Sequence, residues 1–275
     1  MRKPLTRSGL FAGALLLAAT AVSLVPSIYM FDISLRNATD SFSPALIASH
    51  VTFANWQAIL LHGDLARFFL NSALVSVATV ALTLVCVIGL SYAISRLRIK
   101  GGHILLLLVV SALLLPLASL LVPIAKLLEM LGMTNSYFGL IGPETAIGIP
   151  FGTVIVKAAM DEIPVALEEA ARIDGAGSFA VLLRVVVPLV QPSLIVVAIW
   201  QFLYSWNEFF LALVIMTRDA MKPLPLAPLY YQGPFMTDPG KLFAILTLIA
   251  VVPMLAYIVL QRWFVAGLME GGVKG

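Results

Sequence analysis

Long apolar runs separated by short polar segments dominate this chain. Several runs have roughly 20 residues, the length that an α-helix needs to cross a hydrocarbon core of ~30 Å. Since backbone polar groups in lipid find no water, these runs are expected to be helices. The predicted spans are 10–31, 68–95, 104–124, 137–158, 189–215 and 242–264. The pattern predicts an all-α membrane protein with six transmembrane helices, forming a single transmembrane domain over 1–275.

Composition supports a membrane protein over a soluble one. Apolar residues make up 61% of the chain and charged residues only 11%, less than half of the fraction usual in soluble domains. The single cysteine, Cys86, lies within an apolar run. A disulfide framework and a cysteine metal site are therefore excluded.

The distribution of positive charge predicts the orientation. With the amino terminus inside, the 17 Lys and Arg residues divide 11 to 6 in favour of the inside, as the positive-inside rule requires. Both termini are then cytoplasmic. A cleaved signal peptide is the alternative for the first run, because Ala19-Thr20-Ala21 imitates a cleavage site. The run continues well past that site, which favours a retained helix.

No enzyme motif is found. Gly240-Lys241 does not belong to a phosphate-binding loop, because Phe235 occupies the position of its first glycine. The three histidines are far apart in the sequence, and no HExxH or GxSxG pattern occurs. The chain is predicted to be non-catalytic, so any ATP is bound by another protein.

The loop 161–188, between the fourth and fifth spans, is the most informative segment. Pro164 suits the first turn of a helix, Glu168 and Arg172 are four residues apart in the favourable order, and Gly175 suits the helix end. A small apolar stripe runs along one face of this helix. It consists of Ile163, Ala166, Leu167, Ala170 and Ile173.

A second short helix is predicted in the same loop. Its apolar residues are spaced to share one face before Pro188. They are Phe179, Leu182, Leu183 and Val186. Two interpretations are open: a lid on the membrane surface, or a docking surface for a soluble protein. The carboxylates beside the stripe, which anionic lipid would repel, favour docking.

These residues resemble a known family. Glu169-Ala170-Ala171, Gly175, Val185 and Val187-Pro188 resemble the EAA loop of ABC-importer permeases, although that family prefers Ile and Leu at the two valines. The triplet Asp174-Gly175-Ala176 and the tail 267–275 resemble the carbohydrate importers, in particular MalG-like permeases. Gly272 stands where that tail pattern has alanine.

The resemblance implies a type I importer permease of the plasma or inner membrane. It implies a second, MalF-like permease, two copies of a cytoplasmic ATPase, and an external sugar-binding protein. ATP and Mg would bind to the ATPase, and this chain would bind no cofactor. The implied ATPase-coupling residues are Glu168, Glu169, Ala170, Ala171, Asp174, Gly175 and Pro188. The implied contacts of the cytoplasmic tail 265–275 with the ATPase are Gly271, Gly272, Val273, Lys274 and Gly275.

Polar residues within the spans are candidates for the solute path. Asn71, Trp206, Asn207 and Glu208 combine amides, a carboxylate and an aromatic face, which suit a sugar; helix–helix hydrogen bonding is the alternative. Glu144 suits the outer interface better than a cavity wall.

The rival functions are import of a non-sugar solute, secondary transport, and a membrane assembly role. A secondary transporter would normally have intramembrane acids for ion coupling and more helices. The sequence does not name the sugar.

Overall fold

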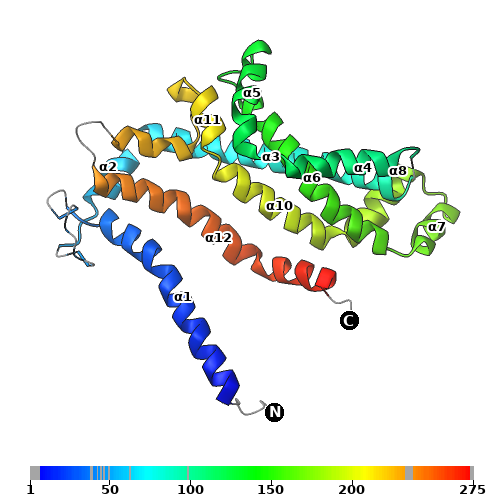
Figure 1. Cartoon of the computed structure of the whole chain (residues 1–275), viewed down its shortest axis with the longest axis horizontal. Coiled ribbons are helices and arrows are strands. Elements are labelled where there is room, and N and C mark those ends of the chain that lie inside the picture. Colours follow the sequence, from blue (N-terminus) through cyan, green and yellow to red (C-terminus); the bar gives the residue numbers. More distant parts are fainter. Residues whose placement is uncertain are drawn as a thin grey trace. The chain divides into compact units, whose positions relative to one another are not determined.

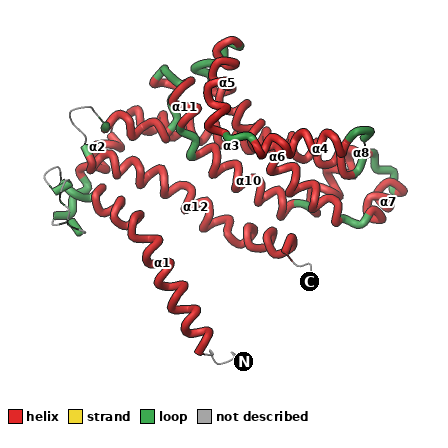
Figure 2. Tube along the Cα trace, in the orientation of Figure 1, coloured by secondary structure: helices red, strands yellow, loops and turns green. Residues whose placement is uncertain are grey.

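The computed structural model describes residues 7–272 apart from positions 38, 39, 42, 44, 46, 49, 62, 98 and 233–237. Helices joined by short loops make up most of this part (Figure 2), as predicted. The α-helices are α1 Arg7–Ser34, α2 Ala54–Leu61, α3 Gly63–Ser95, α4 Gly102–Ser111, α5 Leu117–Met130, α6 Tyr137–Glu162, α7 Val165–Ile173, α8 Ser178–Val181, α9 Val187–Leu189, α10 Gln191–Trp206, α11 Phe210–Ile215 and α12 Pro239–Gly272. The other helical turns are η1 Ala112–Leu114, η2 Leu182–Val186, η3 Asp219–Met221 and η4 Leu224–Tyr231.

Four described helices, α1, α3, α6 and α12, are long and apolar enough to cross a membrane. Four of the predicted runs each fall within one of these helices. Two bent helix pairs, 102–114 with 117–130 and 178–189 with 191–206, are also long and apolar enough when each pair is counted as one span. The described residues therefore hold between four and six candidate spans.

The run 104–124, predicted as one helix, is bent by 105° between Leu114 and Leu117. Pro116 explains the bend. A proline disfavours helical backbone at the residue before it, and Leu115 is extended, with ψ 124°. The carboxyl half of the run then forms α5, which continues to Met130.

The run 189–215 is also broken, because α10 ends at Trp206 and α11 begins at Phe210. Polar side chains take over the backbone groups at this break. The Asn207 amide donates to the carbonyl of Leu203 at 2.7 Å. The Glu208 carboxylate accepts from the backbone N–H groups of Leu211 and Ala212, both at 3.1 Å. This competition with the helical hydrogen bonds explains why one apolar run forms two helices.

The chain groups into two compact units, 1–66 with 227–251 and 67–226 with 252–275. In the second unit α6 lies alongside α10 (Figure 1). One apolar cluster of this unit joins the α8–η2 segment to α3 and α6. Another joins α11 to α5 and α6. These clusters hold the two ends of the α3–α6–α10 bundle.

In the first unit, Arg36 organises the loop after α1. Its guanidinium is fully buried and donates to the Asp32 carboxylate at 2.6 and 2.8 Å. It also donates to the carbonyls of Ser43 and Ala45. One charged side chain thus joins the end of α1 to Ser43 and Ala45.

Candidate functional site

Helix α7 is separated from its neighbours by backbone breaks on both sides. Before it, Ile163 and Pro164 are extended, with ψ 126° and 127°. After it, Gly175 has φ +85°. The N–H of Gly175 donates to the Arg172 carbonyl and the N–H of Ala176 to the Ala171 carbonyl, both at 3.0 Å. This is a Schellman cap with glycine in the left-handed position, so the predicted helix end is confirmed.

The burial of α7 is inverted. Its one buried residue is Glu168, which is 3% exposed. The apolar side chains Val165 and Leu167 are about half exposed, and Ile173 is 86% exposed. The predicted apolar stripe therefore faces away from the protein, apart from Ile163 at the end of α6. A helix that presents its apolar side outwards is typical of a surface that another protein covers.

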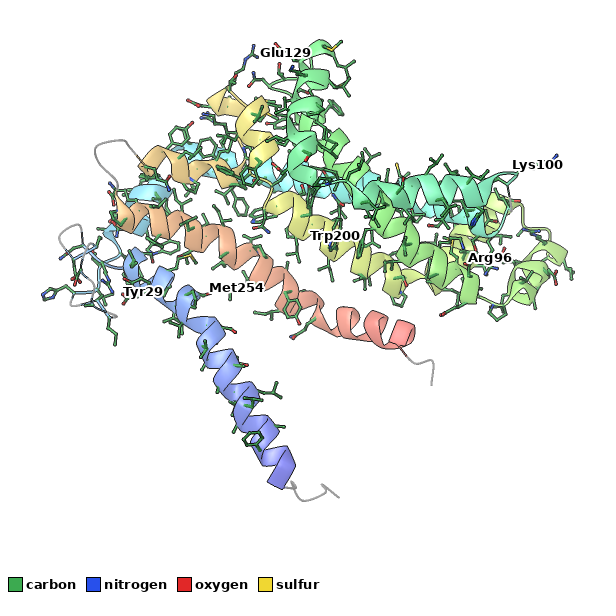
Figure 3. The ribbon with its side chains drawn as sticks, in the orientation of Figure 1. Tyr29, Arg96, Lys100, Glu129, Trp200 and Met254 are labelled. Atoms are coloured by element: carbon green, nitrogen blue, oxygen red, sulfur yellow. The ribbon has the colours of Figure 1, made fainter. Side chains whose placement is uncertain are left out.

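Glu168 is turned inwards by a cation from α3. Its carboxylate pairs with the Arg96 guanidinium, with 2.8 Å between Oε1 and Nε. Arg96 lies beside α7 (Figure 3). The predicted pair with Arg172 is longer, at 4.0 Å, and its guanidinium is half exposed. Glu168 was predicted among the ATPase contacts, but in this structure its carboxylate faces Arg96.

The second short helix differs from its predicted form in two ways. It continues through Pro188 to Leu189, with a wide π turn at Leu182–Val186. Because a proline lacks the N–H that a regular helix needs, a wider turn before it accommodates the missing hydrogen bond. The wide turn also changes the buried face, so that Val181, Leu182 and Val186 are buried while Phe179 and Leu183 are exposed.

The other predicted coupling residues lie on α7 or directly after it, apart from Pro188 in α9. Ala171 is half-buried and the rest are exposed. The exposed ones are Glu169, Ala170, Asp174, Gly175 and Pro188. Beside α7 lies a hollow of about 360 Å³, whose walls include Arg96, Glu168 and Glu169. Carboxylates, small side chains and apolar residues thus share one accessible end of the second unit.

Two of the predicted solute-path residues have internal partners. The Asn71 amide donates to the carbonyls of Ala220 and Lys222 at 3.0 and 2.9 Å. Its oxygen accepts from the Tyr137 hydroxyl at 2.8 Å. Trp206 is 1% exposed and packs edge-on against Phe69. Asn71 thus joins α3 to α6 and to the segment before η4 by hydrogen bonds, whereas Trp206 packs against neighbouring rings.

Asn207 is exposed at the break between α10 and α11, and Glu208 is half-buried there. Glu144, which its sequence context placed at the outer interface, is buried in the structure. It is 1% exposed, and its carboxylate accepts from the Thr79 hydroxyl at 3.3 Å. Gln201 donates to its backbone carbonyl at 3.1 Å. A polar contact inside the bundle thus joins α3, α6 and α10.

The sequence pattern missed two features. Arg96 appeared only as one of the inside charges, because no spacing rule connects it with Glu168. Trp200 and Tyr204 stack with ring centroids 5.7 Å apart and line a hollow of about 590 Å³ with almost entirely apolar walls. Their four-residue spacing on α10 was the available signal.

The predicted tail contacts lie at the end of α12. The backbone of Gly271 and Gly272 belongs to that helix. Val273, Lys274 and Gly275 lie outside the described residues. Among the residues that the structure describes, no group of three or more His, Cys, Asp and Glu is placed to hold a metal ion.

Comparison with known proteins gives consistent matches. Residues 85–270 match the family described as binding-protein-dependent transport system inner membrane component. The sulfoquinovosyl glycerol transport system permease protein of Agrobacterium fabrum is 33% identical, over 92% of this chain and 89% of that protein. The galactooligosaccharides transport system permease protein of Bacillus subtilis is 32% identical, over 95% and 94%.

A solved structure shares the fold. It is a crystal structure of a bacterial ABC transporter involved in the import of the acidic polysaccharide alginate. One of its chains superposes with a TM-score of 0.80 at 21% identity, over 96% of this chain and 100% of that chain. The family match covers more than half of the chain, and the apolar helices agree with it. The protein therefore belongs to the binding-protein-dependent transport system inner membrane components, the multi-pass permease subunits of ABC transporters in the plasma membrane.

Proposed function

We propose that this chain is one of two permeases that together enclose the path of a sugar through the membrane. In this proposal it spans the membrane six times, through α1, α3, the bent pair α4–α5, α6, α10 with α11, and α12, and both termini are cytoplasmic. The 161–188 segment then binds a cytoplasmic ATPase. The observation that carries the proposal is the inverted burial of α7, in which a carboxylate faces the protein and apolar side chains face outwards.

The distribution of charges in the second unit supports the proposed orientation. Arg96 and Arg172 lie at the α7 end. Arg218 lies after α11, and its backbone N–H donates to the side-chain oxygen of Asn135, between α5 and α6, at 2.7 Å. Figure 3 shows Arg96 and Lys100 at one end of this unit and Glu129 away from them. Arg96 and Arg172, which the positive-inside rule assigns to the inside, thus lie apart from Arg218, which it assigns to the outside.

The proposed partners are a second, MalF-like permease, two ATPase copies and an external binding protein. ATP and Mg are bound by the ATPase, and this chain has no catalytic role. In the proposed cycle, closure of the ATPase dimer on ATP moves the two permeases and turns the path outwards. Support for the binding protein comes from a bacterial alginate ABC transporter that was solved in complex with a periplasmic protein. A chain of that structure has a TM-score of 0.61 to this chain.

Within the docking surface, each residue type has a proposed contribution. Gly175 supplies the turn after α7, and the alanines allow close approach of the ATPase. Glu169 and Asp174 provide exposed negative charge for basic residues of the partner. Glu168 acts from inside, by positioning the helix. Gly271–Gly275 are proposed to reach the ATPase as well.

A sugar is the proposed solute because several relatives are named for the carbohydrates that they transport. Besides the two above, the trehalose transport system permease protein of Mycobacterium tuberculosis is 30% identical over 92% of this chain. The alternative is a non-sugar solute. It is favoured by an osmoprotective compounds uptake permease protein of Synechocystis, 28% identical over 91% of this chain.

The break at Asn207 is the proposed contact of this subunit with the solute path. Irregular backbone at membrane depth is stable only inside protein or along a water-filled cavity. Asn207 is exposed at such a break, whereas Asn71 and Trp206 have internal partners. The apolar hollow beside Trp200 offers few hydrogen-bond partners for a sugar.

Affinity purification of the tagged chain in mild detergent tests this function. The expected result is co-purification of an ABC ATPase and a second permease, identified by mass spectrometry. ATP-dependent uptake into proteoliposomes is then measured for trehalose, galactooligosaccharides and glycine betaine, each with the cognate binding protein. Purification without an ATPase would contradict the transporter assignment. Uptake of glycine betaine without uptake of either carbohydrate would contradict the proposal that the solute is a sugar.

A further inference from the structure

One arginine joins α7 to α3 and α6, beside an apolar contact of Ala171 with the cluster around Val181. The Arg96–Glu168 pair is largely removed from solvent, with side chains 9% and 4% exposed and 2.8 Å between their charged atoms. Charge pairs in such a position are weakly screened by salt. Removing one partner leaves the other buried without compensation, so breaking the pair disturbs the structure around it.

Arg96 also binds the end of α6. Its Nη2 donates to the backbone carbonyls of Met160 and, at 2.7 Å, of Ile163. The last carbonyls of a helix lack partners within the helix, and their partial negative charge attracts a cation. Arg96 follows directly after α3, so a single guanidinium connects the ends of α3 and α6 with α7.

The backbone around α7 makes this connection consequential. Extended residues precede the helix and a left-handed glycine follows it, so both junctions lack regular helical hydrogen bonds. Glu168 is also the only buried residue of α7. Two further charge pairs lie at this end. Lys157 and Asp161 are 2.6 Å apart within α6, where Asp161 also accepts from the Ser95 hydroxyl at the end of α3, and Arg172 lies 4.0 Å from Glu168 within α7. Neither pair joins α7 to α3 or α6.

We infer that Arg96 is a positioning residue, which through Glu168 makes α7 move as one body with α3 and α6. This inference rests on the proposed function, because α7 is the helix that the ATPase would push. Without the connection α7 still presents its docking residues, but its displacement is absorbed at the two junctions. The ATPase would then bind without moving the membrane helices.

Spin-label distances test the inference in the full-length chain. Cysteines replace Val85 on α3 and Ala166 on α7, both exposed, in a Cys86→Ala background. With the Arg96–Glu168 pair intact, which we call the joint, the two labels should give one narrow distance distribution. Arg96→Met and Glu168→Gln should broaden it by about twofold or more, because the helix then samples several orientations. Arg96→Lys keeps the charge but loses the planar fork, so an intermediate width is expected.

Two controls separate positioning from general packing. Lys157→Met removes an ion pair that does not involve α7 and should leave the distribution narrow. A second label pair, Val85 with Leu213 on α11, should stay narrow in every variant, whereas a general loss of packing would broaden both pairs. If Arg96→Met does not fold, Glu168→Gln and Arg96→Lys decide the question. A narrow Val85–Ala166 distribution in Glu168→Gln, or equal broadening of both label pairs, would overturn the inference.

Capture of a co-expressed ATPase is measured on the same variants. It should stay within about twofold of the unsubstituted chain, because the exposed docking residues are unchanged. If the unsubstituted chain captures no ATPase, the proposed function fails while the distances still test the joint. If capture is normal and the distances stay narrow, the joint fails alone.

Discussion

The two ends of the α3–α6–α10 bundle are built in opposite ways. At the α11 end, polar side chains are used internally: Asn71 bonds two loop carbonyls and the Tyr137 hydroxyl, and Glu208 caps α11. At the α7 end a carboxylate is buried and apolar side chains are exposed. Both ends leave apolar side chains exposed, such as Phe210 on α11 and Ile173 on α7, but only at the α7 end does a carboxylate of the same short helix face inwards.

This difference has a physical cause in the sequence. Asn71 and Tyr137 provide complementary donors and acceptors, so the α11 end satisfies its own polar groups. The α7 helix is too short and too alanine-rich to bury much apolar area. It is therefore held by charge on the inside and remains free to bury its other side against a second protein.

The largest expected effect follows from the turn after α7. Gly175→Val places a β-branched residue at φ +85°, which costs about 2 kcal/mol or more. No atom lies within 4 Å of the added Cβ, so the backbone conformation is the sole obstacle. Capture of the ATPase should fall roughly thirtyfold, and uptake with it, while membrane insertion is unchanged.

Gly175→Asn is the matched control, because asparagine tolerates the left-handed region. It should retain most of the capture measured by co-purification at equal expression. Equal capture by the valine and asparagine variants would show that the left-handed turn at Gly175 is not needed for ATPase binding.

A comparable change at the α11 end should affect stability and leave docking alone. Asn71→Ala leaves two carbonyls and a hydroxyl without their partner, a loss of about 1–3 kcal/mol. The melting temperature in detergent should fall. Capture of the ATPase per folded molecule should stay the same. Reduced capture at an unchanged melting temperature would contradict the separation of the two ends.

Changes on the outer side of α7 should do the reverse. Ile173→Glu puts a charge where an apolar side chain is 86% exposed, and Glu169→Lys reverses an exposed charge. Each should weaken capture by about tenfold, or about 1.4 kcal/mol, with no change in melting temperature. The effect of Glu169→Lys should shrink at high salt, because exposed charges are screened. Lower melting temperatures in both variants would show that α7 is part of the core instead.

The smallest expected effect belongs to the tail. Deletion of Gly271–Gly275 should lower uptake a few-fold without affecting insertion, because it removes one of two proposed contacts with the ATPase. Flotation of membranes and proteoliposome uptake measure the two quantities. Unchanged uptake and ATP hydrolysis would mean that the tail makes no functional contact.

Much of the fold follows from apolar length alone, since four predicted runs lie within single helices. The two broken runs show what length does not determine. The run 104–124 was predicted as one helix although it contains Pro116, where the structure bends. The break at Asn207 depends on Glu208 capping α11, a contact that hydropathy does not encode.

The candidate site was predicted in its local parts. The helix end at Gly175 followed from sequence because a glycine cap is a local feature. The direction in which α7 faces did not follow, because it depends on Arg96, far away in the sequence. The face of the second short helix was wrong for a similar reason, since the wide turn at Leu182–Val186 shifts the periodicity.

Site-specific photo-crosslinking in native membranes tests whether the outer side of α7 contacts the ATPase. A photoreactive phenylalanine derivative replaces Ile173 on α7 in one variant and Phe210, which is also exposed, on α11 in the other. The account predicts that position 173 crosslinks to the ABC ATPase, that position 210 does not, and that Gly175→Val abolishes the crosslink at 173. Crosslinking of position 173 to lipid alone, or equal ATPase crosslinks from both positions, would contradict it.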